Sequence, residues 1–179
     1  MIGTWRPRPR GLAIRLTEFV VRGGLISGAG LTCRVAMGRA GVVARKQEGD
    51  GGTPAGRMAL VRVFYRADRV RPPACGVPVE PIAVDDDWCD DAAEPAYNKK
   101  VRLPFTGSHE ALWRGDGVYD IVGVLDWNFD PVVPGRGSAI FLHVAAPDFA
   151  PTAGCLALGE ADLRACLAAG LTSIAVVGV

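Results

Sequence analysis

The sequence predicts a mainly β, single-domain fold, which we expect to be a β-sandwich or a barrel-like sheet with one or two short helices. Its 179 residues are 49% hydrophobic, which is enough to bury one core and too little chain for two full domains. Strand-like runs of Val, Ile and Leu recur along the chain, separated by many of its 23 glycines and 13 prolines. This punctuation favours short strands and many loops over a helical bundle.

Charge, hydropathy and cysteine spacing exclude several classes of protein. The net charge of +1 gives no basic surface for nucleic acid, and no apolar run reaches the roughly 20 residues that span a bilayer. The five cysteines include no C-x-x-C pair, so neither a zinc ribbon nor a thioredoxin-like centre is indicated, and we expect no metal site. Cys75 and Cys89 lie close enough in sequence for a disulfide in an oxidising compartment, although isolated cysteines are more often buried small hydrophobes.

The first 29 residues are expected to form a leader with a possible first strand. The segment from Ala13 to Val21 has strand-like composition. Arg15, Glu18 and Arg22 interrupt its apolar runs before they reach the ~7 to 15 residues of a cleavable export signal. The export route therefore stays open, and residues 30–179 are expected to form the functional domain.

A glycine-rich loop separates the next predicted strands. Residues 31–45 have the pattern of a strand, a glycine turn and a strand, and residues 58–66 alternate apolar and basic side chains as a strand does. Between them, KQEGDGGTPAG at 46–56 combines glycines with a Thr-Pro pair, which specifies a fixed loop. The loop lacks the G-K-[ST] ending of a phosphate loop, so a structural role is favoured over a nucleotide site.

An acidic block, DDDWCDD at 85–91, follows a proline-rich stretch that breaks regular structure. We expect a solvated loop here. The alternative is a substrate-facing wall, including Trp88 and Asp90, that meets an ammonium group. Residues 108–113 are expected to begin one or two helical turns, and His109 within them belongs to a class of loop histidines that is more often structural or exposed than part of a site.

Two further segments lead to the part of the chain that is richest in chemistry. Residues 118–128 are expected to form a buried strand, and residues 131–137 a turn. In the strand that follows, at 138–144, the period of two places His143 on the same face as Phe141. A histidine on so apolar a strand is costly unless it has a partner or lies at a rim.

A turn of small residues follows this strand and presents Cys155. A thiol is a useful nucleophile only as its thiolate, and a nearby imidazole can take the proton at neutral pH. We therefore expect His143 and Cys155 to act together. Gly154 allows a tight turn in which backbone N–H groups point at an oxyanion beside the sulfur. Residues 160–170 have the pattern of a short helix, and residues 172–179 that of a last strand.

These motifs resemble those of the YkuD-type L,D-transpeptidases, whose signature is a histidine, a loop and then [S/T]-x-G-C. Thr152 to Cys155 match that ending, and Thr53 to Gly56 match the T-P-x-G segment that commonly lies upstream. The resemblance covers residues 30–179 and implies a YkuD-like catalytic domain there. It makes Cys155 the nucleophile, His143 its general base and the backbone of Gly154 and Cys155 the oxyanion site.

The chain departs from the common pattern of this family, and it looks like a compact branch. The spacing from histidine to cysteine is shorter, TAGC replaces S-H-G-C, and Ala157 stands where many members carry a polar or basic residue. Arg136 is the candidate for the lost cationic contact. The other candidate substrate contacts are Thr152, Trp88, Asp90, Asn98 and His109.

The activity that the resemblance implies is ping-pong acyl transfer on peptidoglycan stem peptides. The Cys155 thiolate attacks a peptide carbonyl of the donor stem, a thioester forms, and the amine of an acceptor diaminopimelate stem resolves it into a crosslink. The bond attacked is the usual L,D bond or an L-alanine to diaminopimelate linkage. No cofactor or metal is needed, and the implied location is the periplasm or cell envelope. The sequence does not specify the oligomeric state.

Three alternatives stay open from the sequence. With water as the acceptor, the same site would act as an L,D-carboxypeptidase. A cysteine hydrolase of the cytosol is favoured by the absence of a clear export signal. A noncatalytic wall-binding domain, in which Cys155 is only packed, is the competitor from another class of protein.

Overall fold

The computed structural model describes residues 17–178, which form one mainly β domain, as the sequence predicts. The main sheet consists of β1 (Thr17–Arg22), β2 (Leu25–Gly28), β3 (Leu31–Arg34), β6 (Gly56–Tyr65), β7 (Val79–Pro81), β11 (Ile121–Leu125), β12 (Phe141–Val144), β13 (Leu156–Leu158) and β14 (Leu171–Val176). Two smaller sheets contain β4 (Val42–Val43) with β5 (Thr53–Pro54), and β8 (Asp86–Cys89) with β9 (Lys100–Arg102) and β10 (His109–Ala111). The single helix of the described residues is α1 (Glu160–Ala168).

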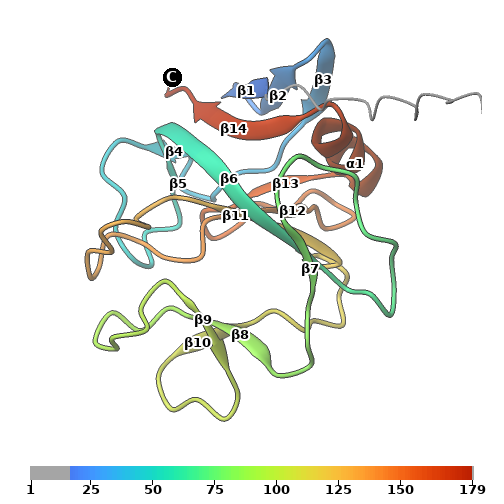
Figure 1. The fold of residues 1–179 in the computed structure, drawn as a ribbon. Coiled ribbons are helices and arrows are strands. Elements are labelled where there is room, and N and C mark those ends of the chain that lie inside the picture. Colours follow the sequence, from blue (N-terminus) through green and yellow to red (C-terminus); the bar gives the residue numbers. More distant parts are fainter. Residues whose placement is uncertain (1–16, 179) are drawn as a thin grey trace, which may run out of the picture.

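The main sheet curves until its two edges meet. Its strands follow the order β13-β12-β11-β6-β14-β1-β2-β3, and β7 pairs with β6 beside this path. Just after β3, Ala36 exchanges two backbone hydrogen bonds with Ala157 of β13, at 2.8 and 2.9 Å. This bridge connects the first strand of the order to the segment that follows the last one, and the sheet is nearly closed (Figure 1). The predicted barrel-like sheet is therefore confirmed.

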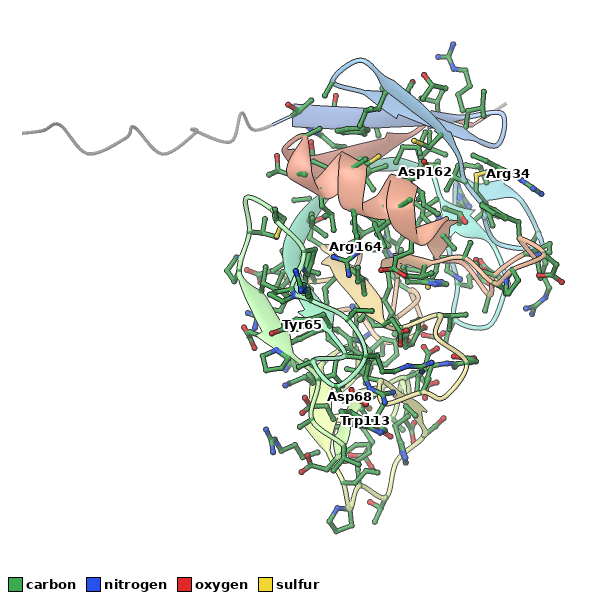
Figure 2. All side chains as sticks on the ribbon, turned by 90° about the vertical axis from the view of Figure 1, so that its right-hand side faces the viewer. Arg34, Tyr65, Asp68, Trp113, Asp162 and Arg164 are labelled. Atoms are coloured by element: carbon green, nitrogen blue, oxygen red, sulfur yellow. The ribbon has the colours of Figure 1, made fainter. Side chains whose placement is uncertain are left out.

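The helix packs on the main sheet by the face that its sequence pattern indicates. Leu163, Cys166 and Leu167 are its buried residues, and they share one core with side chains from β1, β6, β11 and β14. In Figure 2 α1 crosses the front of the molecule, and Arg164 lies on its lower side. The Arg164 guanidinium donates to the backbone oxygen of Arg71 at 3.1 Å, which ties the helix to the loop after β6.

The sheet β10-β8-β9 forms a separate layer, drawn below the main sheet in Figure 1. Arg66, just after β6, attaches the main sheet to this layer, because its guanidinium lies 3.6 Å from the ring centre of Trp113, just after β10. The same guanidinium donates to both carboxylate oxygens of Asp68, at 2.8 and 2.9 Å. Figure 2 shows Asp68 and Trp113 close together. A second core cluster fills the space between the two layers, where Trp88 packs edge-on against Phe141 with ring centres 5.1 Å apart.

Two local expectations from the sequence are wrong. The acidic block at 85–91 contains the buried strand β8 instead of being a solvated loop. Asp86 is only 1% exposed, and its carboxylate accepts hydrogen bonds from Lys100 Nζ at 3.1 Å and from the Ala83 N–H at 2.9 Å. Residues 108–113, expected to be helical, contain β10, because their backbone pairs with β8.

The N-terminal part of the described chain belongs to the main sheet. β1 pairs with β14 and β2 with β1, whereas residues 1–16 of the expected leader lie outside the described residues. The boundary at residue 30 stays a prediction. No helix within residues 17–178 is long and apolar enough to cross a membrane. All five cysteines lie in this range and are free thiols, Cys75 and Cys89 included.

Candidate active site

Cys155 immediately precedes β13, beside the start of β12. The two strands are parallel, with Leu142 opposite Leu156, and this register brings the thiol next to the first residues of β12. Its Sγ accepts a hydrogen bond from the Phe141 N–H at 3.4 Å and donates one to the backbone oxygen of Ala139 at 3.1 Å. Cys155 is 8% exposed, so its sulfur is a buried group held by the backbone on two sides.

His143 lies two residues beyond Phe141 on β12 and therefore on the same face of the strand. Its Nδ1 is 2.8 Å from the backbone oxygen of Val144. A neutral imidazole that donates from Nδ1 keeps Nε2 as its acceptor, and we assign this tautomer from the hydrogen bond. The ring of Tyr119 packs edge-on against the imidazole, with ring centres 5.2 Å apart.

Burial favours the neutral form of both the Cys155 thiol and the His143 imidazole. It raises the pKa of the Cys155 thiol to about 12, and the charge of Glu110 adds to this effect, while the Phe141 N–H and the cation of Lys46 oppose it. Burial also lowers the pKa of His143 below its ordinary value. At neutral pH the resting site therefore holds a protonated thiol and an imidazole that is free to accept a proton.

Cys155 and His143 line one cavity of about 400 Å³ between the main sheet and the β10-β8-β9 layer. No hydrogen bond joins the two side chains in the described structure, because each is bonded to a backbone oxygen instead. The wall carries charges of both signs. The cations are Arg39, Lys46 and Arg114, and the carboxylates are Glu48, Asp90 and Glu110.

Most of these charged groups already have partners. Lys46 forms an ion pair of 2.5 Å with Asp50, and the Tyr119 hydroxyl donates to Glu110 at 2.6 Å. Burial raises the pKa of Glu110. Asp90 differs, because its buried Oδ1 has no hydrogen-bond partner among residues 17–178.

The turn that precedes Cys155 is held by two threonines. Thr152 Oγ1 accepts from the Gly154 N–H at 3.1 Å and donates to the backbone oxygen of Cys155 at 2.7 Å. Thr53, in β5, donates to the Gly154 oxygen at 2.9 Å and accepts from the Gly38 N–H at 2.8 Å. Gly154 itself has a φ of 149°, and a Cβ there would lie 2.9 Å from a backbone oxygen. The T-P-x-G segment thus packs directly on the cysteine turn.

The structure separates the predicted site residues into two groups. Gly154, Thr152 and Asp90 line the cavity with Cys155 and His143. The Gly154 N–H, expected at the oxyanion, is bonded to Thr152 in this state.

Trp88 and Asn98 are buried, at 4% and 3% exposed, and the indole N–H of Trp88 donates to Asn98 Oδ1 at 3.0 Å. Arg136 lines a different hollow, beside residues 44–48. His109 Nε2 lies 3.3 Å from Asp87, and its Nδ1 lies 2.7 Å from the backbone oxygen of Gly107. None of these four lines the Cys155 cavity in the described structure, so substrate contact by them stays a prediction.

Several residues of the cavity have no distinguishing signal in the sequence. They are Arg39, Lys46, Glu48, Glu110, Arg114 and Tyr119. Lys46 and Glu48 fall in the predicted loop and Glu110 follows His109, but spacing alone does not bring any of them to residue 155.

Two further findings concern metal binding at the site and the similarity of the chain to known proteins. Within the described residues, no group of three or more His, Cys, Asp or Glu is arranged to hold a metal ion. A family model for the L,D-transpeptidase catalytic domain, YkuD, matches residues 12–169. No curated protein and no solved structure shows a significant match to the chain.

Proposed function

Since the chain belongs to the YkuD family of L,D-transpeptidase catalytic domains, we propose that it is a cysteine L,D-transpeptidase acting on peptidoglycan stem peptides. The observation that carries this proposal is the shared cavity: the Cys155 thiol and the His143 imidazole line one hollow that also carries both signs of charge. A packed structural cysteine requires no such cavity.

The first half of the reaction is acylation of Cys155. As the thiol leaves the Ala139 oxygen, its proton passes to Nε2 of His143 and the sulfur bonds to the donor carbonyl carbon. The Cys155 N–H lies beside the sulfur and is the proposed donor to the resulting oxyanion. The carbon–nitrogen bond to the leaving amino acid then breaks, and His143 returns the proton to the departing amine, leaving a thioester.

The second half reverses these roles with a new amine. The acceptor amine attacks the thioester carbon and gives a proton to His143. The carbon–sulfur bond breaks, the sulfur takes the proton back, and an amide crosslink remains. A protonated thiol in the resting site fits this sequence, because the proton has to leave only when the substrate carbonyl is in place.

The charged wall supports a stem peptide as the substrate. Such a peptide carries free carboxylates and, at diaminopimelate, an ammonium group. The buried and unpartnered Oδ1 of Asp90 fits the ammonium group, in agreement with the role expected for the acidic block. Arg39, exposed at the rim of the cavity, is a better-placed candidate for a carboxylate than Arg136. The charged wall of the cavity is compatible with attack at either bond, the usual L,D bond or the L-alanine to diaminopimelate linkage.

The proposed site of action is the periplasm or cell envelope, where the donor and acceptor stems are found. The second candidate activity is L,D-carboxypeptidase, in which water resolves the same thioester. It is favoured by the neutral His143, which can activate water as readily as an amine.

Mass spectrometry of purified peptidoglycan fragments tests these assignments. We compare wild type with Cys155→Ala and His143→Ala, and use Cys75→Ala as the matched control, because Cys75 bonds to the Val77 oxygen at 3.3 Å and lies outside the cavity. New dimers from wild type and Cys75→Ala only would support transpeptidation, and fragmentation would identify the joined carbonyl. Shortened monomers alone would favour the carboxypeptidase. Neither product from folded, reduced protein would refute the proposal.

A further inference from the structure

The backbone of Ala139 has an unusual conformation at the point where it contacts the reactive sulfur. Its φ is 50°, in the left-handed region that residues with a Cβ rarely adopt. The carbonyl oxygen of this residue is the acceptor of the Cys155 thiol, at 3.1 Å. Something outside Ala139 must therefore stabilise this conformation.

The side chain of Asn98 supplies that stabilisation. It is 3% exposed, and its Oδ1 accepts from the Ala139 N–H and from the Trp88 indole N–H, each at 3.0 Å. Its Nδ2 donates to the backbone oxygens of Trp127 at 3.0 Å and Asn128 at 2.8 Å. Two donors face the oxygen and two acceptors face the nitrogen, so only one orientation of the amide satisfies all four bonds.

The same corner also supports the second group that contacts the sulfur. The Trp88 ring packs edge-on against Phe141, with ring centres 5.1 Å apart, and the Phe141 N–H donates to the Cys155 sulfur at 3.4 Å. Asn98 and Trp88 are thus joined to both backbone groups that hold the thiol, although neither side chain lines the cavity.

We propose that Asn98 is a positioning residue for Cys155, holding Ala139 in its left-handed conformation so that the Ala139 carbonyl fixes the thiol. The catalytic consequence rests on the proposed function, but the effect on the thiol does not. While the Ala139 oxygen accepts the S–H, the proton stays on the sulfur and points away from the imidazole. Loss of the Asn98 amide lets Ala139 relax, which frees the thiol from its acceptor and from its fixed position.

The test is the pH dependence of Cys155 alkylation by iodoacetamide, followed by mass mapping of the peptide that contains Cys155. In Asn98→Gly the backbone keeps its freedom at a φ of 56° but loses all four bonds. We expect the midpoint of the alkylation profile to fall by about one pH unit, because a hydrogen bond that stabilised the protonated thiol is gone. Crosslinking turnover should fall about 10- to 100-fold, because the sulfur is no longer held in place.

The matched control is Asn128→Gly, which removes the side chain of another left-handed asparagine, with a φ of 50°. That side chain bonds to Val133 and Gly137 instead of Ala139, so its alkylation profile should equal that of wild type. Rescue is tested in the double variant that combines Asn98→Gly with Ala139→Gly. A glycine at position 139 adopts the left-handed conformation without a Cβ clash. The added glycine should return the profile toward wild type and recover at least about fivefold of the lost turnover.

Several results would overturn the proposal. An Asn98→Gly profile equal to that of wild type would remove Asn98 from the control of the thiol. Effects of Asn98→Gly and Ala139→Gly that simply add would show a general structural role instead. Where Asn98→Gly does not fold, Asn98→Ser serves in the same comparison, since its hydroxyl can pair with one of the buried groups but is too short to span all four. Because alkylation needs no peptidoglycan, an inactive wild type with the expected profiles would refute the proposed function alone.

Discussion

Replacing Thr53 by valine tests the contact between the glycine-rich loop and the cysteine turn. The hydroxyl of Thr53 is completely buried and joins the Gly38 N–H, at 2.8 Å, to the Gly154 oxygen, at 2.9 Å. Valine has nearly the same shape, so Thr53→Val removes the two hydrogen bonds and leaves both backbone groups buried without a partner. Each such group costs about 1–3 kcal/mol. We expect the free energy of unfolding to fall by about 2–6 kcal/mol.

Thr53→Ser is the matched variant, because it keeps the hydroxyl and loses only a methyl group, which is worth about 1 kcal/mol. Urea unfolding followed by tryptophan fluorescence measures both variants. The valine variant should be less stable than the serine variant by about 1 kcal/mol or more. Equal stabilities would refute the reasoning, since they would show that the two backbone groups find other partners.

Three further predictions concern the same part of the molecule. Gly154→Ala brings a Cβ within 2.9 Å of a backbone oxygen at a φ of 149°, so thermal unfolding should show a loss of about 2–3 kcal/mol; an unchanged melting temperature would contradict this. Glu110→Gln removes a negative charge that raises the pKa of Cys155, so the midpoint of Cys155 alkylation should move to lower pH, and a shift to higher pH would contradict the assignment. Asp86→Ala leaves the part-buried Lys100 ammonium group and the Ala83 N–H without their acceptor and should cost about 2 kcal/mol in urea unfolding, whereas Asp85→Ala, with a side chain 37% exposed, should cost less than about 1 kcal/mol.

His143 and Cys155 could be singled out as a candidate pair from the sequence because their signal is local. His143 and Cys155 are twelve positions apart in the printed sequence, and their residue types are those of a base and a nucleophile. A period of two along one strand gave the face of the histidine, and small residues around Cys155 indicated a turn. The structure brings the two residues to one cavity, and their roles in a reaction stay a proposal.

The groups that hold this pair were not accessible, because their contacts join distant segments. Thr53 reaches Gly154 across 101 positions of the chain, and Asn98 reaches Ala139 across 41. The sequence singled out Asn98 as a possible substrate wall, although nothing in its neighbours shows that four hydrogen bonds bury its amide. Which polar side chains find such partners depends on the folded arrangement and not on residue type.

The acidic block shows the same limit for charged residues. Five aspartates within seven positions favour a solvated loop, because an unpaired carboxylate is costly to bury. Asp86 is nevertheless buried, because Lys100 and the Ala83 N–H compensate it. Only the pairing of β8 with β9 brings that lysine into place, and the pattern of charges along the chain carries no trace of the pairing.

The central place of β14 governs the order in which the molecule can be assembled. This strand is the last one within residues 17–178, yet it joins β13-β12-β11-β6 on one side to β1-β2-β3 on the other. During synthesis the two halves therefore have no common strand until Leu171–Val176 has been made. Folds that depend on such long-range pairing form slowly. Cys155 is an accessible thiol until the second core cluster, with Trp88, Tyr119 and Phe141, packs around it, so oxidants and alkylating agents meet a far more vulnerable protein before folding than after it.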